Sequence, residues 1–307
     1  MSIESEVKKL VTSEINKRNY VTTDQLAAAI ESVLKRISDG DSGGVKLPRP
    51  GGKLMYDLIA KDLDPVKYNR TFKGVKWKKT NTGRPSAKAG TSQSSPNGYT
   101  IGHPIKYIPP QLVDGALRCF IDPNQKNYQG AKETHCHIKI NPKGYSGGWI
   151  PAKKRHVFDL ELTTHGNWKQ SAALVWQLHP SNFGKGWVGH RQPPASLHLT
   201  KEGRWMMVAF GASKTGAKKY DAASSPVKKY LPHTPGRQVV RIESVTDHTG
   251  KNSLLRANVN GSSIEIAKVP MGIGLTNGRT FCSVGLYGGA KKPLAYVDIH
   301  RVRVYLK

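Results

Sequence analysis

The sequence contains little cysteine, with only Cys119, Cys136 and Cys282 among 307 residues. No two of them form a Cys-x-x-Cys pair, and an odd number cannot be fully paired within one chain. The spacing therefore argues against both a disulfide framework and a zinc site. We expect three reduced thiols that are mostly buried.

Long hydrophobic runs are also missing. No stretch of about 18 apolar residues, the length of a membrane-spanning helix, occurs in the chain. The first residues, MSIESEVKKLV, lack the continuous apolar segment of a secretory signal. We therefore expect no membrane insertion and no signal peptide, and a protein that is made in the cytoplasm and released by lysis or carried on a virion.

Acidic residues are few. Asp and Glu number 21 against 48 Lys and Arg, which gives a formal net charge of +27. Net charge bears on association and not on fold, so it predicts a polyanionic partner: nucleic acid, an anionic membrane surface, or a uronate-bearing or sulfated glycan. A glycoside hydrolase needs two positioned carboxylates. The shortage of acids favours a reaction that needs none.

Two common enzyme motifs are absent as well. The P-loop motif and HExxH do not occur, which removes the simplest nucleotide-binding and zinc-protease interpretations.

From Gly115 onward the sequence alternates apolar and polar residues with a period of two, as β-strands do. Short segments of this kind are separated by Gly, Pro and Asn turns: ALRCFID, THCHIKI, HVFDLELTT, AALVWQLH, SLHLT, RWMMVAFG, VVRIESV, LLRANVN, FCSVGLYG and YVDIHRVRVYL. Many short strands predict a sandwich or a barrel. The alternation indicates that one face of each sheet packs on the core while the other meets solvent or ligand.

Two motifs in this strand-rich part carry a resemblance to a known family. The segment Ser171–Pro180, SAALVWQLHP, and the later Ser283–Tyr287, SVGLY, resemble the Gln-x-His and Gly-x-Tyr strands of the heparin lyase I-like and alginate lyase-like polysaccharide lyases. The closing stretch Tyr296–Tyr305 resembles the last strand of these enzymes. The resemblance implies a mainly β fold, a concanavalin-like β-jelly-roll sandwich over 115–307, and cleavage of a uronate polymer by β-elimination.

The resemblance also implies roles for individual residues. In such lyases an amide or guanidinium neutralises the uronate carboxylate, a His or Tyr removes the C5 proton, and a Tyr protonates the departing O4. By this resemblance Gln177 binds the carboxylate, His179 acts as the base or positions it, and Tyr287 acts as the acid or as both. Strand geometry agrees, because Gln177 and His179 share one face while Trp176 and Leu178 turn to the core. Each motif alone is more often a solvated polar pair or a packed aromatic, so the functional interpretation rests on finding both in the expected order on a strand-rich chain.

The chain departs from that family on an early strand. The family usually carries an Arg-x-Glu pair there, whereas the corresponding stretch is KETHCH, from Lys132 to His137. Lys132 would supply a point charge without the bidentate carboxylate contact that Arg makes. His135 and His137 share a strand face, but no third ligand stands at diagnostic spacing, so we expect a sugar-facing or solvated pair and no metal site.

The remaining candidates for substrate binding are basic or aromatic. They are Lys139, His165, Trp168, His190, Arg191, Arg204, Lys291 and Lys292. Each is equally typical of a solvated surface charge or a buried aromatic. No cofactor is expected, and the sequence leaves open whether a structural calcium ion is bound.

Two apolar stripes with helical spacing predict two short helices within residues 1–40. Their members are Ile3, Val7, Leu10 and Val11, then Leu26, Ile30, Val33 and Ile37. Helices this short are marginal alone, so each stripe must pack on the body of the protein, on copies of the chain in a homo-oligomer, or on a larger assembly. A short helical head before a glycan-active body resembles the virion-attachment segments of phage tail proteins, which would make other virion proteins its partners.

Residues 41–114 are rich in Gly, Pro, Ser and Lys, which indicates a basic linker or arm. Within it, Tyr68–Arg84 interleaves aromatic and basic residues, a mixture that can follow a nucleic-acid backbone. A solvated basic loop whose aromatics plug into the neighbouring domain has the same composition.

Three functions follow from these patterns. The first is binding and β-elimination cleavage of an acidic polysaccharide, for example as a phage depolymerase. The second is a catalytically inactive glycan-binding or structural virion protein with a lyase-like fold. The third is nucleic-acid binding through Tyr68–Arg84, which the charge permits but no recognition-module motif supports.

Overall fold

The computed structural model describes residues 48–63, 78–79, 85–86, 92–94, 100–102, 110–120, 134–145, 149–166, 168, 173–180, 193–211, 226–272, 279–288 and 295–307. They lie in one structural unit, Lys46–Lys307. The predicted helices of 1–40 and most of the segment Tyr68–Arg84 fall outside them. Among the described residues, no helix has the length and hydropathy needed to cross a membrane.

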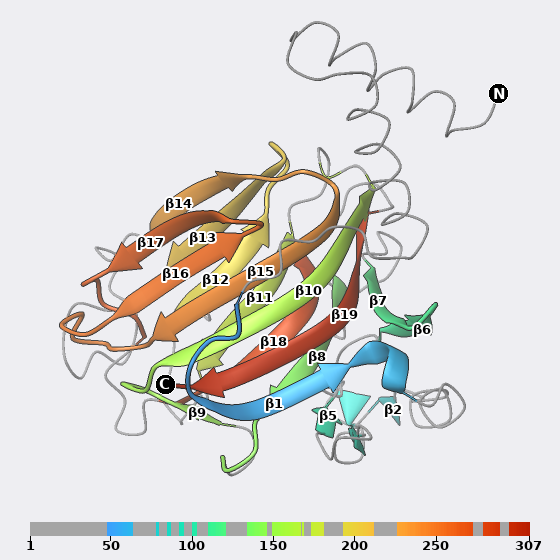
Figure 1. Cartoon of the computed structure of the whole chain (residues 1–307), viewed down its shortest axis with the longest axis horizontal. Coiled ribbons are helices and arrows are strands. Elements are labelled where there is room, and N and C mark those ends of the chain that lie inside the picture. Colours follow the sequence, from blue (N-terminus) through green and yellow to red (C-terminus); the bar gives the residue numbers. More distant parts are fainter. Residues whose placement is uncertain are drawn as a thin grey trace, which may run out of the picture. The chain divides into compact units, whose positions relative to one another are not determined.

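The described chain forms a sandwich of two large antiparallel β-sheets (Figure 1). The first sheet has the order β17 (Ser262–Ala267), β16 (Leu254–Val259), β15 (Gly236–Val245), β10 (His156–Gly166), β19 (Ala295–Leu306), β7 (Ala116–Phe120) and β6 (Gln111–Val113), with β1 (Lys53–Ile59) also paired to β19. The second sheet has the order β14 (Val227–Pro232), β13 (Arg204–Ala209), β12 (Ala195–Leu199), β11 (Ala173–Pro180), β18 (Arg279–Gly288), β8 (Thr134–Asn141), β5 (Thr100–Gly102) and β4 (Ser92–Ser94), with β9 (Ile150–Pro151) paired to β18. Outside the two sheets, β2 (Lys78–Lys79) pairs with β3 (Pro85–Ser86), and a short 3-10 helix, Ala60–Asp62, follows β1. The predicted mainly β jelly-roll sandwich is confirmed.

Strands that are distant in the sequence lie side by side in both sheets. In the first sheet β10 lies between β15 and β19, and in the second β18 lies between β11 and β8. These pairings are antiparallel, which allows each sheet to bury one face and expose the other.

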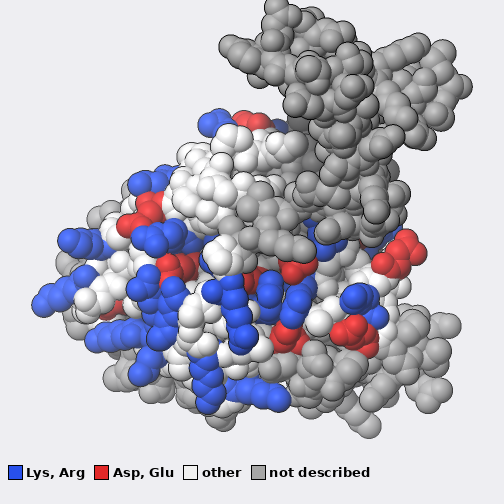
Figure 2. All heavy atoms as spheres, in the orientation of Figure 1, with Lys and Arg blue, Asp and Glu red and all other residues white. Residues whose placement is uncertain are grey.

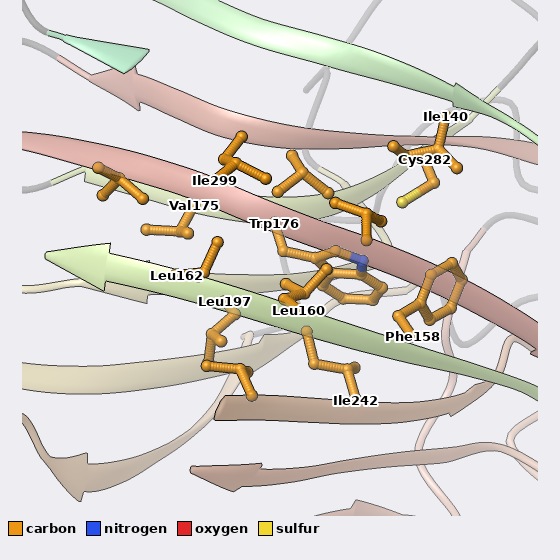
Figure 3. Close-up of a cluster of buried hydrophobic side chains, with 14 of the residues drawn as sticks. Ile140, Phe158, Leu160, Leu162, Val175, Trp176, Leu197, Ile242, Cys282 and Ile299 are labelled. Carbon is orange, nitrogen blue, oxygen red and sulfur yellow. The ribbon is translucent and has the colours of Figure 1, made fainter. Parts of the chain in front are cut away.

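The core lies between the two sheets and follows the alternation of their strands. Phe158, Leu160 and Leu162 of β10 are fully buried, and Trp176 of β11 meets Phe158 edge-on with ring centroids 5.2 Å apart. Figure 3 shows side chains of both sheets meeting in this layer. Burying one side chain of this size contributes roughly 1.5–3 kcal/mol, so the layer is the main source of stability.

All three cysteines are free and buried, as predicted from their spacing. Burial raises the pKa of the Cys282 thiol far above its ordinary value. The cysteines therefore act as small apolar side chains of the core.

The jelly roll begins earlier than the predicted boundary at residue 115. Lys53–Ile59, inside the segment predicted to be a linker or arm, forms β1 and pairs with β19 near the carboxyl terminus. Tyr56 and Leu58 of this strand are fully buried in the core. The prediction was wrong here because a single short strand between Gly- and Pro-rich stretches gains its strand identity from a distant partner and not from its own pattern.

Arginine and acidic side chains alternate across the outer face of the first sheet. Bidentate ion pairs with N–O distances of 2.7–2.9 Å join Arg241 to Asp159, Arg301 to Asp57 and Arg118 to Asp298. Further arginine contacts hold Glu161, Glu243 and Glu265. Figure 2 shows the two charges intermixed on this face. The carboxylates of these ion pairs are therefore neutralised by arginine side chains of the same face.

Full or partial burial keeps several histidines in the neutral form. His156 is 1% exposed; its Nδ1–H donates to the carbonyl of Lys154 (3.1 Å) and the hydroxyl of Tyr145 donates to its Nε2 (2.8 Å). Burial lowers the pKa of His156 to about 4. Burial also lowers the pKa of His233 and of His300 to about 4.

These histidines predict that the free energy of unfolding falls as the pH drops from about 6.5 to 5. Unfolded histidines take up protons near their ordinary pKa of about 6.5, whereas His156, His233 and His300 stay neutral in the fold until about pH 4. The unfolded state therefore binds more protons in this window. Urea unfolding across it measures the effect, and His233→Gln should reduce the slope. A flat profile would contradict the neutral, buried state of these imidazoles.

Candidate functional site

The second sheet presents a polar outer face opposite its core face. On β11, Trp176 and Leu178 lie in the core, so Gln177 and His179 project from the other side, as predicted. The neighbouring strands contribute to this face Ser196 and His198 of β12, Phe281, Ser283, Gly285 and Tyr287 of β18, and His137 and Lys139 of β8. We call this surface the outer face.

Gln177, Ser283 and Lys139 lie side by side on three neighbouring strands. The register pairs Gln177 with Ser283, and Ser283 with Lys139. The Gln177 amide donates from Nε2 to Ser283 Oγ (3.0 Å). Gln177 is 4% exposed and Ser283 1%, so this hydrogen bond fixes the orientation of the amide. We call these three residues the central row.

An aromatic cluster borders the central row on one side. The imidazole of His179 stacks on Phe281, its cross-strand partner, with centroids 4.9 Å apart and planes inclined by 27°. The Lys139 ammonium lies 4.6 Å from the ring centroid of Trp149 and 5.4 Å from that of Phe281. Burial lowers the pKa of Lys139, and the two ring faces attract its charge. His179 and Lys139 are thus held by the same phenyl ring.

On the other side of the central row, His137 packs over Gly285. The register places His137 opposite Gly285 and Tyr287 opposite His135, so His137 and Tyr287 are diagonal cross-strand neighbours. Gly285 has φ 147°, and a Cβ there would collide with Cα and Cβ of His137. Because Gly285 has no side chain, His137 can pack against it across the two strands. His137 is 2% exposed.

The outer face has a definite order along the strands. His179 and Phe281 come first, the central row follows, and Tyr287 comes last, beyond His137. A β-bulge between Leu174 and Trp176 separates the central row from Tyr287, and bulges of this kind change the direction of side chains. The predicted base and acid consequently flank the central row and are not cross-strand partners of each other.

The β12 strand adds two residues that sequence reasoning missed. Ser196 pairs with Gln177 in the register, and its hydroxyl lies 2.8 Å from Nε2 of His198. Burial, with a smaller contribution from Lys228, lowers the pKa of His198 to about 4. A neutral imidazole has one protonated and one unprotonated ring nitrogen, so its Nε2 forms one hydrogen bond with the Ser196 hydroxyl. Residues two apart on a strand share a face, and this rule could have identified Ser283 beside Gly285 and Ser196 beside His198. No local pattern marks Trp149, which lies outside the strands.

Of the predicted substrate-binding residues not yet placed, several fall outside the described part of the chain. Arg204 begins β13, two strands from β11, with its guanidinium 5.1 Å from the ring centroid of Tyr230. His135 faces Tyr287 by register, and its side chain is outside the described part. Lys132, His190, Arg191, Lys291 and Lys292 all fall outside the described residues.

Two candidates belong elsewhere. His165 lies on β10 of the first sheet, where it stacks on Tyr296 and contacts Asp298 with Nε2–Oδ2 at 3.0 Å. Trp168 is 3% exposed and packs edge-on to His233. Neither lies on the outer face: His165 belongs to the first sheet, and Trp168 is the buried aromatic that its sequence also allowed.

The outer face differs in charge from the first sheet. The strands of the second sheet contain no Asp or Glu, whereas the acids on the first sheet are paired with arginine. In the described part of the chain, no three His, Cys, Asp or Glu side chains come together as metal ligands. The groups available for chemistry on the outer face are therefore amide, hydroxyl, imidazole, phenol and ammonium groups.

No protein-family model matches the chain, and no curated protein matches it. Solved structures to which the chain is similar include polysaccharide lyases. An endo-β-1,4-glucuronan lyase of the fungus Trichoderma reesei is 12% identical, covering 72% of this chain and 88% of that one, with a TM-score of 0.48. An alginate lyase of polysaccharide lyase family 7 is 11% identical, covering 72% and 85%, with a TM-score of 0.43. The Emp47p carbohydrate recognition domain is 13% identical, covering 70% and 90%, with a TM-score of 0.39. At these identities the likeness concerns the fold alone.

We predict that Gly285→Ala destabilises the protein. The new Cβ would collide with the backbone of His137 and require a strained φ, at a combined cost of about 2 kcal/mol or more. Gly51→Ala is the matched control, since no atom of the described residues lies within 4 Å of the position that its Cβ would take. Thermal unfolding should show a lower midpoint for Gly285→Ala and an unchanged one for Gly51→Ala. Equal midpoints would mean that His137 does not pack over Gly285.

Proposed function

We propose that the outer face binds an acidic, uronate-containing polysaccharide and cleaves it by β-elimination. One observation carries the proposal: the central row sets an amide, a hydroxyl and an ammonium side by side between His179 and Tyr287, on a sheet whose described strands hold no carboxylate. A glycoside hydrolase would need two carboxylates there. β-Elimination from a uronate needs groups that neutralise the substrate carboxylate and groups that exchange protons.

The reaction assigns a task to each part of the outer face. The base takes the proton from C5, the electrons of that bond form the C4=C5 double bond, the C4–O4 bond breaks, and O4 leaves with a proton from the acid. Gln177 and Lys139 receive the substrate carboxylate, which makes the C5 proton more acidic. His179, next to Gln177 on the same strand face, serves as the base, and Tyr287 takes the role of acid that the resemblance to the lyases implies. His137, at 2% exposure, acts as a positioning residue beside Tyr287.

The charge distribution supports a polyanionic substrate. The chain carries +27, and the acids of the first sheet are already neutralised by arginine. The uncompensated positive charge draws a polyuronate towards the protein, an attraction that added salt screens.

A second candidate is a glycan-binding or structural virion protein without catalysis. The burial of Gln177 favours it, because the residue is 4% exposed and its side-chain amide already donates a hydrogen bond to Ser283. Attachment to other virion proteins or self-association through 1–40, release by lysis or on a virion, and nucleic-acid binding by Tyr68–Arg84 remain predictions.

The first test measures the ultraviolet absorbance of the conjugated double bond that β-elimination creates. We expect a rise with at least one member of a panel of heparin, alginate, polyglucuronate, hyaluronan and bacterial capsule extracts. Tyr287→Phe should lower the turnover by about 10²-fold or more, since it removes the acid. Binding to a polymer without any rise in absorbance would favour the second candidate and exclude the lyase.

The two histidines beside the central row can be told apart by substitution. We expect His179→Asn to lower kcat by about 10²-fold with little change in the unfolding midpoint, as for a residue that exchanges a proton with substrate. His137→Asn should instead lower the unfolding midpoint, because it disturbs a nearly buried contact. His248→Asn, on a partly exposed turn after β15, is the control. Full activity of His179→Asn would remove His179 from the mechanism.

A further inference from the structure

The far edge of the second sheet carries an exposed aromatic ring with a cation beside it. Tyr230 of β14 is 44% exposed, and the guanidinium of Arg204 lies 5.1 Å from its ring centroid. Tyr230 and Val227, both on this edge strand, are the large hydrophobic side chains that are exposed within the described residues. An exposed aromatic held by an arginine is suited to a ligand that has both a flat apolar surface and a negative charge.

The register places this pair on the outer face, in line with the candidate site. Following the cross-strand partners from Tyr230 leads through Met206, His198 and Leu174 to Tyr287. On the same strands, Trp205 and Leu231 point to the core, which confirms that Tyr230 and Arg204 face outward. Tyr230 and Tyr287 are therefore two ends of one row across the sheet.

A second, adjacent row carries positive charge at its two ends. It leads from Lys228 of β14 through Val208 and Ser196 to the central row, where Gln177 and Ser283 are followed by Lys139. Lys228 is exposed, and its charge contributes to the lowered pKa of His198. A polyanion lying across the strands would meet a cation at each end of this row.

We propose that Tyr230, Arg204 and Lys228 form a distal subsite for another uronate unit of the polymer that the central row holds. The proposal rests on the proposed function of the outer face. Four strand spacings of about 4.8 Å separate β14 from β18, so the subsite lies roughly 19 Å from Tyr287, several sugar units along the chain. The C–H face of the sugar ring stacks on Tyr230, and Arg204 and Lys228 bind its carboxylate.

The test compares single substitutions on β14 in the full-length protein carrying Tyr287→Phe, which keeps the polymer intact. Affinity electrophoresis in gels containing polyglucuronate, alginate, hyaluronan or heparin reports binding. We expect Tyr230→Ala to weaken binding to the retained polymer by about tenfold, as for the loss of one stacking contact, and Tyr230→Phe to keep it. Val227→Ala is the matched control, because it removes an exposed apolar side chain that projects from the opposite face of the same strand.

The outcomes separate this subsite from the proposed function. If the parent protein binds none of the polymers, the function of the outer face fails and the subsite with it. If the parent binds a polymer and Tyr230→Ala binds it within about twofold, the subsite alone is overturned. A matching loss of retention in gels containing duplex DNA would assign Tyr230 to polyanions in general and overturn the uronate assignment.

Discussion

The packing of the two apolar sheet faces against each other determines where the polar residues point. Trp176 is buried against Phe158, and because neighbouring residues of a strand project to opposite sides, Gln177 and His179 must lie on the outer face. A register shift of one residue would expose the indole and bury the polar pair. The orientation of the candidate site is therefore maintained by the hydrophobic core, and no separate interaction is needed to turn its side chains outward.

The same two-layer arrangement separates the charges. Arginine and carboxylate side chains meet on the outer face of the first sheet, where neighbouring strands bring them into bidentate contact. The strands of the second sheet contribute lysine, arginine and histidine without acids. One layer is thus close to electroneutral while the other has uncompensated positive charge. This asymmetry gives a basic chain one preferred face for a polyanion, which a uniform distribution of the same charges would not.

Close approach of the backbones shapes the middle of the outer face. Gly285 lets β18 and β8 come together so that His137 occupies the space between the central row and Tyr287. Phe281 holds both His179 and Lys139 through its ring. The reactive groups of the proposed lyase are therefore placed by glycine and phenylalanine, whose own side chains take no part in proton transfer.

The sequence by itself determined a mainly β sandwich or barrel, the reduced and buried state of the cysteines, and the common face of Gln177 and His179. These follow from composition and from the period of two, which any strand with one buried face must obey. Only the tertiary structure decided that β1 belongs to the sandwich, that Ser283 and Lys139 lie beside Gln177, and that His165 lies on the other sheet. Each of these depends on which strand pairs with which and in what register. Strand pairing joins backbone groups far apart in the chain, and a local pattern specifies the face of a residue but not its neighbour across the sheet.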